Sequence, residues 1–594
     1  MSLLVILLPS AAILAIAYRV YGGLLTRLLR LDDQAATPAV ALRDDVDYEP
    51  IPPQLLLGQH FSAIAAAGPI VGPILAGVAF GWLPALLWIL VGSIFIGGVH
   101  DFTALVASVR HKARSIAEVV RDHMSRRSYV LFLAFVWIAL VYIIVAFTDI
   151  TASSFVGRQV LENGESVAGG AIASASLLYL VLPIIMGLCM RFGRLPLSWA
   201  TIIFVPLVGL AIWAGRFIPF DLAQALGTSD AVAQRIWGAL LLGYCLVAAM
   251  APMWLLLQPR GHLGGCFLYV ALAGAAIGLV ASDRLVAGDA AIRYPAFTSW
   301  QTAKAGSLVP MLFITIACGA CSGFHSLIAS GTTSKQLRRE TDARPIGYGA
   351  MLLEAMVAIV SLACVMVLAA DSPLAGQPPN FVYALGMGRF LEMLGVPTAL
   401  GVSFALMAFT TFVYDTLDVC TRLGRYIIQE LTGLGGKAGG WLGTALTAGV
   451  PLLFLLRPQV DSSGAIVPVW KTFWSLFGAS NQLLAALSLL GVTVWLWRTR
   501  RETWIWLVTG LPTAFMYSMS TWALATMTLP RFWQAGRIAL PADPVPWAGL
   551  VLLGLAAVML VEAIRVLAGP QGPTSPEPAR MPRHGVAVPG TASA

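Results

Sequence analysis

The stretch IAAAGPIVGPILAGVAFGWLP, residues 64–84, is apolar enough to lie in a bilayer, yet two Gly-Pro pairs interrupt its centre. These pairs are Gly68-Pro69 and Gly72-Pro73. Each proline removes a backbone N–H and clashes with the preceding helical turn. Hydrocarbon offers no water to the carbonyl groups that are released, so protein or a polar cavity must receive them. The alternatives are a Pro-kinked packing helix and a break that forms a binding site.

The composition is that of a polytopic membrane protein. Of the 594 residues, 58% are hydrophobic and only 11% are charged, whereas soluble domains carry about 25% charged residues. Apolar runs of about 20 residues, each long enough to cross a bilayer, recur along the chain. We therefore predict an all-α protein embedded in the lipid bilayer. It should have about 15 spans, near residues 3–24, 55–80, 84–108, 130–156, 168–190, 197–215, 236–257, 263–282, 305–330, 346–370, 395–421, 439–456, 472–497, 503–528 and 546–564.

The positive charge follows the loops between these spans. The net charge is +8, but the Lys and Arg residues cluster in short loops, so membrane topology explains them and no nucleic-acid partner is expected. With the N-terminus outside, 26 of the 37 Lys and Arg residues fall on the inner side, six of them in RHKARSIAEVVRDHMSRR (110–127). This bias predicts a multi-pass protein of the inner (plasma) membrane with its C-terminus in the cytoplasm.

Four regions follow from this reading. Residues 1–54 hold the first membrane helix and a cytoplasmic loop, and 55–500 form the core of the protein. Residues 501–568 hold the C-terminal membrane helices. Residues 569–594 are rich in Pro and Gly, which predicts a disordered cytoplasmic tail.

A second interrupted segment favours the binding-site alternative. CGACSGFHSLIASGTTSKQ (318–336) lies largely in span 305–330 and mixes Gly with Ser, Thr and one His. By the span count it runs opposite to 55–80, and two broken helices of opposite direction are typical of inverted-repeat, leucine-transporter-like carriers. Seven span steps separate them where a five-plus-five repeat needs five, so we expect two inserted spans, at 236–257 and 263–282.

Several long motifs resemble the carbon starvation protein (CstA) family. They are GQHFSAIAAAGPIVGPILA (58–76), VHDF (99–102), CSGFHSLIASGTTSKQL (321–337), ETDARPIGYGAMLLEA (340–355), TLDVCTRLGRYIIQE (416–430) and LFGASNQLLAALSL (476–489). The resemblance implies a bacterial transporter that imports scarce carbon sources during carbon starvation. Members are associated with peptide uptake and, in some cases, with proton-coupled pyruvate uptake. The family is grouped with the amino acid–polyamine–organocation superfamily, whose fold is the inverted repeat.

Ionisable residues inside the predicted spans are candidates for ion coupling, because burying them in lipid is costly. His60 and His325 flank the two breaks and could relay protons, although bonds between helices are the alternative. Asp415 and Asp418 share a helix face, and a salt bridge from Asp418 to Arg422 or Arg425 is the alternative to a site role. The full set is His60, His100, Asp101, Asp149, His325, Glu354, Asp415 and Asp418.

Uncharged polar residues complete the predicted substrate and ion site. Asn481 and Gln482 could bind a carboxylate or an amide, or could bond between helices. The predicted site contains His60, Gly68, Pro69, Gly72, Pro73, Asp101, Asp149, Ser322, His325, Thr332, Thr333, Asp415, Asp418, Asn481 and Gln482. Cys318 and Cys321 have metal-ligand spacing, but no second such pair exists, so we expect helix packing there and no metal.

We predict a secondary active transporter for a small carboxylate or a short peptide, with no cofactor. The coupling ion is expected to be H⁺, with Na⁺ as the alternative. No Walker motif is present, which argues against direct ATP drive. An intramembrane aspartyl protease is disfavoured because its Gly-x-Gly-Asp motif is missing, so no enzymatic activity is expected. A channel or nutrient sensor is the remaining alternative.

Overall fold

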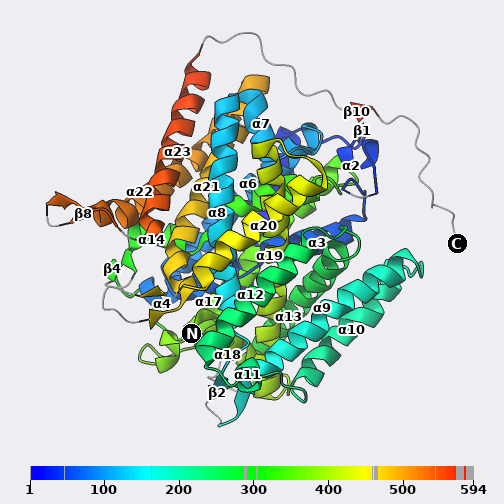
Figure 1. Cartoon of the computed structure of the whole chain (residues 1–594), viewed down its shortest axis with the longest axis vertical. Coiled ribbons are helices and arrows are strands. Elements are labelled where there is room, and N and C mark those ends of the chain that lie inside the picture. Colours follow the sequence, from blue (N-terminus) through cyan, green and yellow to red (C-terminus); the bar gives the residue numbers. More distant parts are fainter. Residues whose placement is uncertain are drawn as a thin grey trace.

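The structure, a computed structural model of the chain, consists almost entirely of helices (Figure 1). It describes residues 2–569, apart from 46, 162–163, 286–290, 303–304, 458, 461–465, 535 and 542, together with 581–582. The predicted tail at 569–594 therefore lies outside the described residues, except for 569 and 581–582.

The elements follow one another with short connections. The first half contains α1 (Leu4–Leu28), α2 (Pro38–Ala41), α3 (Pro53–Ile64), α4 (Gly68–Phe80), α5 (Trp82–Gly92), η1 (Ser93–Gly97), α6 (Gly98–Arg110), α7 (Ile116–His123), α8 (Arg126–Ser153), α9 (Gly169–Arg191), α10 (Leu197–Gly215), α11 (Leu222–Leu226), α12 (Asp230–Ala248) and α13 (Leu257–Leu285). The second half contains α14 (Leu308–Thr315), α15 (Ala317–Ala320), α16 (Gly323–Ile328), η2 (Ala329–Thr333), η3 (Glu340–Asp342), η4 (Arg344–Gly349), α17 (Ala350–Met366), η5 (Pro373–Gly376), α18 (Pro379–Glu392), α19 (Thr398–Thr432), α20 (Gly436–Leu455), α21 (Val469–Arg500), η6 (Trp506–Gly510), α22 (Leu511–Phe532) and α23 (Pro544–Ala568). Elements η1, η2, η4 and η6 are π turns.

The strands form two-stranded antiparallel pairs outside the helical body. The pairs are β1 (Ala35–Ala36) with β10 (Met581–Pro582), β2 (Arg158–Val160) with β3 (Ser166–Ala168), β4 (Gln301–Thr302) with β5 (Gly306–Ser307), β6 (Gln459–Val460) with β7 (Ile466–Val467), and β8 (Trp533–Gln534) with β9 (Arg537–Ile538). Four of the five are hairpins between consecutive helices, so they close loops and build no sheet core.

Among the described residues, 12 helices are long and apolar enough to cross a membrane, or 13 if α3 and α4 count as one span bent by 44°. These confirm a polytopic helical membrane protein. The other two predicted spans, 305–330 and 503–528, fall on the short helices α14 to α16 and on η6 with α22. The number of spans stays a prediction.

Helix packing relates the two halves of the core. The broken helix of the first half packs through α3 against α13 and through α4 against α17. The broken helix of the second half packs through α14 and α16 against α21 and through α15 against α5. Helices α8 and α12 of the first half cross α19 and α20 of the second. Six apolar spans separate the two broken helices, so the second runs opposite to the first when each span crosses once. The halves are therefore α3–α8 with α12 and α13, and α14–α17 with α19 to α21.

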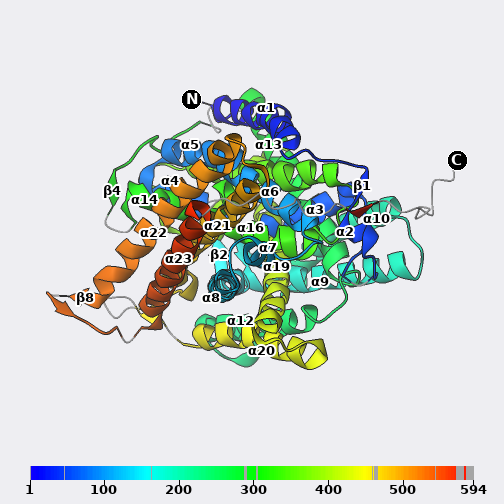
Figure 2. The same cartoon turned by 90° about the horizontal axis from the view of Figure 1, so that it is seen from above.

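The inserted helices are not those that we expected from the sequence. The predicted insertions, 236–257 and 263–282, correspond to α12 and α13, which belong to the core. Instead α9 and α10 pack mainly on each other at one edge of the molecule, opposite α22 and α23 (Figures 1 and 2). Hydropathy could not separate these cases, because inserted and core spans are similarly apolar.

The first break lies slightly before the Gly-Pro pairs. Helix α3 ends at Ile64 and α4 begins at Gly68, so residues 65–67 form the non-helical link. Pro69 stands in the first turn of α4, where its missing N–H has no helical partner in any case. Pro73 lies inside α4. The break therefore lies at the alanines just before the first proline, in the turn that Pro69 leaves without a donor, rather than within both Gly-Pro pairs.

Hydrogen bonds from the end of α21 hold α7 against the rest of the protein. His111, which follows α6, lies with its Nε2 2.9 Å from the Nε2 of His123. Burial lowers the pKa of His123 to about 4 and also lowers the pKa of His111. Arg498 donates to the carbonyl of His123 at 2.7 Å, and Arg500 donates to that of Leu28 on α1 at 2.7 Å.

Candidate substrate and ion site

The two broken helices cross in direct contact. Helices α14 and α15 pack against α4. A Cβ added to Gly68 would overlap the side chain of Cys318, and one added to Gly72 would lie 3.2 Å from the Cα of Ile316. Glycine at these positions therefore permits a close approach of two backbones, which any larger residue would prevent.

Side chains from α21 bond the second break. Asn481 accepts from the Phe324 N–H at 2.9 Å, at the start of α16, and donates to the Ser322 hydroxyl at 3.0 Å. Gln482 donates to the carbonyl of Ala317 at 3.0 Å. The predicted residues Ser322, Asn481 and Gln482 thus meet at the break. In this conformation they satisfy backbone groups that the break releases.

The first break has comparable partners on other helices. The hydroxyl of Thr416 on α19 donates to the Ala63 carbonyl at 2.9 Å, at the end of α3. His60 Nδ1 lies 2.9 Å from the Thr333 hydroxyl, which joins α3 to η2. His60, Thr332 and Thr333 line a small cavity of about 10 Å³. The structure thus brings these three predicted residues together beside the break.

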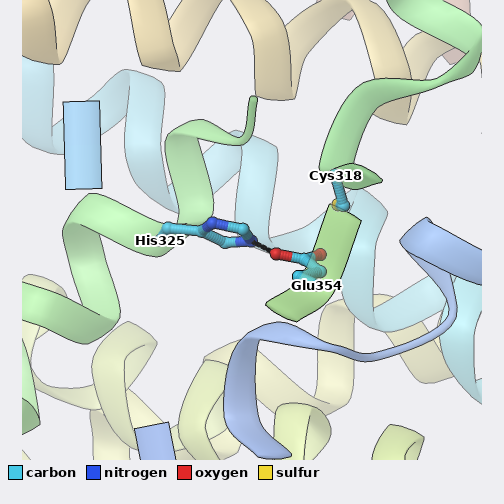
Figure 3. A group of neighbouring side chains, drawn as sticks. All are labelled: Cys318, His325 and Glu354. Atoms are coloured by element: carbon cyan, nitrogen blue, oxygen red, sulfur yellow. Dashed lines mark ion pairs between the residues drawn. The ribbon is translucent and has the colours of Figure 1, made fainter. Parts of the chain in front are cut away.

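A buried group of ionisable side chains lies where the breaks cross. Asp101 receives two imidazoles: His100 Nδ1 lies 2.7 Å from one carboxylate oxygen and His325 Nδ1 lies 2.8 Å from the other. The opposite nitrogen of His325 lies 3.3 Å from Glu354 on α17 (Figure 3). All four side chains are at most 1% exposed. Such a group can exchange a proton along hydrogen-bonded neighbours. The helix that carries Asp101 is immediately preceded by the π turn η1, a feature that is frequent at functional sites.

A second buried group centres on Arg260 of α13. Its guanidinium donates to Asp415 at 2.6 Å and pairs with Asp418, and both carboxylates belong to α19. The Tyr244 hydroxyl contacts both Arg260 and Asp418, and Ser62 of α3 donates to Asp415. Two carboxylates share one cation here, so the ordinary charges of the three groups sum to −1.

Arg260 falls between the predicted spans 236–257 and 263–282, which predicts an inner loop there. Instead α13 already begins at Leu257, and Arg260 is fully buried. The alternative for Asp418, a salt bridge to Arg422 or Arg425, is replaced by the pair with Arg260, and Arg422 donates to backbone carbonyls near the end of α12. In the sequence Arg260 lies between Pro259 and Gly261, next to Gln258 and His262, so its neighbours do not distinguish a buried arginine from one in a short loop.

Asp149 lies apart from both groups. It accepts from the Gln234 amide at 2.9 Å and from the Trp470 N–H at 2.8 Å, at the start of α21. A carboxylate in this position caps a helix N-terminus and stabilises it. Asp149 is 7% exposed, so in this conformation it is a buried cap on α21.

A wider cavity of about 330 Å³ opens beside η2. Its walls come from the α6–α7 connection, α7, α8, α16, η2 and α19, including Ser330 and Gly331 near the second break. Charged groups of both signs line it: Asp47, Arg114, Glu118, Lys335 and Glu430. The volume suits a small organic molecule.

Two residues next to the predicted site deserve inclusion in it. His100 and Glu354 were recognised as ionisable residues within spans but were not placed in the predicted site, because nothing in the sequence brings α6 and α17 together. The structure joins both to Asp101 and His325. Cys318, expected to serve only in packing, lies beside His325 and Glu354, whereas Cys321 does not belong to this group.

The chain is similar in sequence to known transporters. A family model described as carbon starvation protein CstA matches residues 2–376 and 371–523. The chain is 32% identical to the peptide transporter CstA of Helicobacter pylori strain J99, covering 89% of this chain and 82% of that protein. It is also 32% identical to the pyruvate/proton symporter BtsT of Escherichia coli K12, covering 88% and 81%. A crystal structure of an Eremococcus coleocola manganese transporter in complex with an aromatic bis-isothiourea substituted compound aligns over 89% of this chain and 98% of that one, at 15% identity and a TM-score of 0.48.

Proposed function

Because the chain belongs to the carbon starvation protein CstA family, we propose that it imports a small carboxylate or a short peptide by proton-coupled alternating access. The chain is a transporter rather than an enzyme. The observation that carries the proposal is the buried ionisable group at the crossing of the two broken helices.

The coupling proton would use the group around His325. A proton that enters a buried site needs a titratable acceptor with bonded neighbours, and intramembrane carboxylates and imidazoles serve this role in carriers. His325 bonds to Asp101, and Asp101 also bonds to His100. His325 belongs to α16 and Asp101 to α6. Protonation of His325 would therefore change the attraction between these two helices. Na⁺ coupling is the alternative, since released carbonyls also coordinate that ion.

The substrate would bind next to the breaks and leave through the wider cavity. Helix α4 begins at Gly68, and a helix N-terminus attracts a carboxylate. The wider cavity reaches Ser330 and Gly331 and carries both charge signs, which suits a zwitterionic peptide as well as a carboxylate. Its location beside the basic segment 110–127 supports an opening to the cytoplasm of an inner-membrane protein, with the N-terminus outside and the C-terminus inside.

Uptake into proteoliposomes tests this function. We would assay radiolabelled pyruvate and dialanine at two external pH values, with and without Na⁺, and with a protonophore. We expect accumulation of at least one substrate that rises at the lower external pH and collapses with the protonophore. Full accumulation from Na⁺ alone in the presence of the protonophore would overturn proton coupling. Equilibration without accumulation would indicate a channel instead.

A variant at the proposed coupling site sharpens the test. His325→Leu removes both ring nitrogens from a fully buried position, so we expect proton-driven accumulation to be lost. Size-exclusion chromatography of the detergent extract checks that the variant inserts and folds. Normal uptake by a folded His325→Leu protein would exclude this residue from coupling.

A further inference from the structure

Three potential metal ligands converge beside the second break. Cys318 comes from α15, His325 from α16 and Glu354 from α17. One ligand atom from each lies within 4.8 Å of the others. Figure 3 shows the imidazole directed at the Glu354 carboxylate, with the Cys318 side chain next to that carboxylate. All three residues are buried, so water does not compete for these atoms.

Two of the three converging groups lack hydrogen-bond partners. Among the residues that the structure describes, neither carboxylate oxygen of Glu354 has one and neither has Nε2 of His325, although the two groups form an ion pair at 3.3 Å. A buried polar atom without a partner costs about 1–3 kcal/mol, and native proteins rarely leave several together. An occupant that accepts lone pairs from oxygen and nitrogen at once, either a shared proton or a cation, would satisfy these atoms.

The neighbours of His325 orient it as a metal ligand. Its Nδ1 lies 2.8 Å from Asp101, which fixes the ring and leaves the Nε2 lone pair facing Glu354 and Cys318. Metal-binding histidines generally bond through their second nitrogen to a carboxylate in this way. Nδ2 of Asn481 lies 3.6 Å from the Cys318 sulfur, and both residues are buried.

We propose that Cys318, His325 and Glu354 bind one divalent transition-metal ion of the zinc class. A sulfur, a nitrogen and an oxygen ligand suit Zn²⁺ or Co²⁺, whereas Mg²⁺ and Ca²⁺ prefer oxygen alone. A thiolate and a carboxylate together carry two negative charges, which balance the ion in a buried site. Bonds of about 2.0–2.3 Å require the three ligand atoms to move together by about 1 Å from the separation seen here.

The bound ion would fix the second broken helix. Cys318 precedes the extended residues Cys321 and Ser322, and His325 follows them. An ion held by both sides of the break, and by Glu354 of α17, would join three elements that otherwise meet through side-chain packing. This role is independent of the transported substrate, but the ion would occupy the nitrogen of His325 that is open to the coupling proton in the proposed function, so the ion-bound and protonated states of His325 exclude each other.

Cobalt spectroscopy tests the proposal without any transport assay. Full-length protein, purified without a polyhistidine tag and stripped with a chelator, is titrated with Co²⁺. We expect one equivalent to produce a near-ultraviolet thiolate-to-cobalt charge-transfer band together with visible d–d bands, and Zn²⁺ to displace both. Cys318→Ser should lose the charge-transfer band, and Glu354→Gln should weaken binding at least about tenfold. Cys321→Ser is the matched control, a neighbouring buried cysteine outside the group, and should bind as the unmodified protein does.

Melting temperatures give a second readout if one variant folds poorly. Zn²⁺ should raise the melting temperature of the unmodified protein and of Cys321→Ser, because it binds the folded state. Absence of a cobalt band in the unmodified protein would overturn the proposal and favour a proton shared between His325 and Glu354. An undiminished band in Cys318→Ser, or no zinc-dependent stabilisation of the unmodified protein, would overturn it as well.

Discussion

The tight crossing of the broken helices predicts a specific sensitivity at Gly72. A Cβ at this position would lie closer than 3.0 Å to the Thr315 carbonyl oxygen and 3.2 Å from the Ile316 Cα. Both obstacles are backbone atoms next to the second break, so a rotamer change cannot relieve the overlap. Gly72→Ala should therefore force the two helices apart.

The cost can be separated from helix propensity with a matched control. Gly209 lies inside α10, and a Cβ there would meet nothing within 4 Å. Alanine should stabilise both helices by up to about 1 kcal/mol, but overpacking at Gly72 costs about 1–3 kcal/mol. If the transport cycle requires the conformation in which the two broken helices are in contact, a destabilisation of this size reduces the population of that conformation by about 5- to 150-fold.

The assay compares the two variants directly. We expect Gly72→Ala to lower the melting temperature and the initial uptake rate, with Gly72→Val more severe, while Gly209→Ala resembles the unmodified protein in both. Membrane insertion, followed by the yield of monodisperse protein, should be equal. Equal uptake and equal melting temperatures for Gly72→Ala and Gly209→Ala would refute the close crossing.

Three further predictions concern buried polar groups. Arg260→Met should destabilise the protein by about 3–5 kcal/mol, since it leaves carboxylates unpaired, and adding Asp415→Asn should restore part of the loss; a neutral Arg260→Met would contradict the ion pairing. Asn481→Leu should cost about 1–3 kcal/mol in thermal stability by freeing the amide at the second break, and an unchanged melting temperature would show that this bond is dispensable. Because burial lowers the pKa of His123 to about 4, its unfolded form takes up a proton first as the pH falls below about 6.5. Stability should therefore be full above that pH and fall by up to about 3 kcal/mol toward pH 4, and His123→Phe should flatten this profile; parallel profiles would exclude His123 as the cause.

Hydropathy was sufficient for the class of fold and for most span positions, because the bilayer fixes the length of each apolar run. Hydropathy located the first break less accurately, because the position of a break depends on the backbone conformation. The first break was placed at the prolines, but the structure has it at residues 65–67, since a proline is tolerated in the first turn of a helix. Local sequence identifies a breaker, and the surrounding packing decides which peptide breaks.

Partners between distant helices could not be predicted from the sequence. The alternative to a site role for Asp418 was a salt bridge to an arginine one or two turns away, whereas its ion pair comes from Arg260, 158 positions earlier in the chain. Glu354 and His325 were each visible as buried ionisable residues, but only the approach of α17 to the second break brings them together. Such pairings follow from the path of the whole chain, which a single sequence without its relatives does not specify.

Because α21 bonds to the second break, a movement of the break would also move this helix. Asn481 bonds to the broken helix near the middle of the molecule, and α21 continues without a break from Asn481 to Arg500. At 1.5 Å per residue this part of α21 is about 28 Å long. At the far end, Arg498 and Arg500 hold the backbone near α7 and at the end of α1. A tilt of α21 at the break would therefore move its far end at the membrane surface. A fluorescent label on α7 could follow the transport cycle there without altering the binding site.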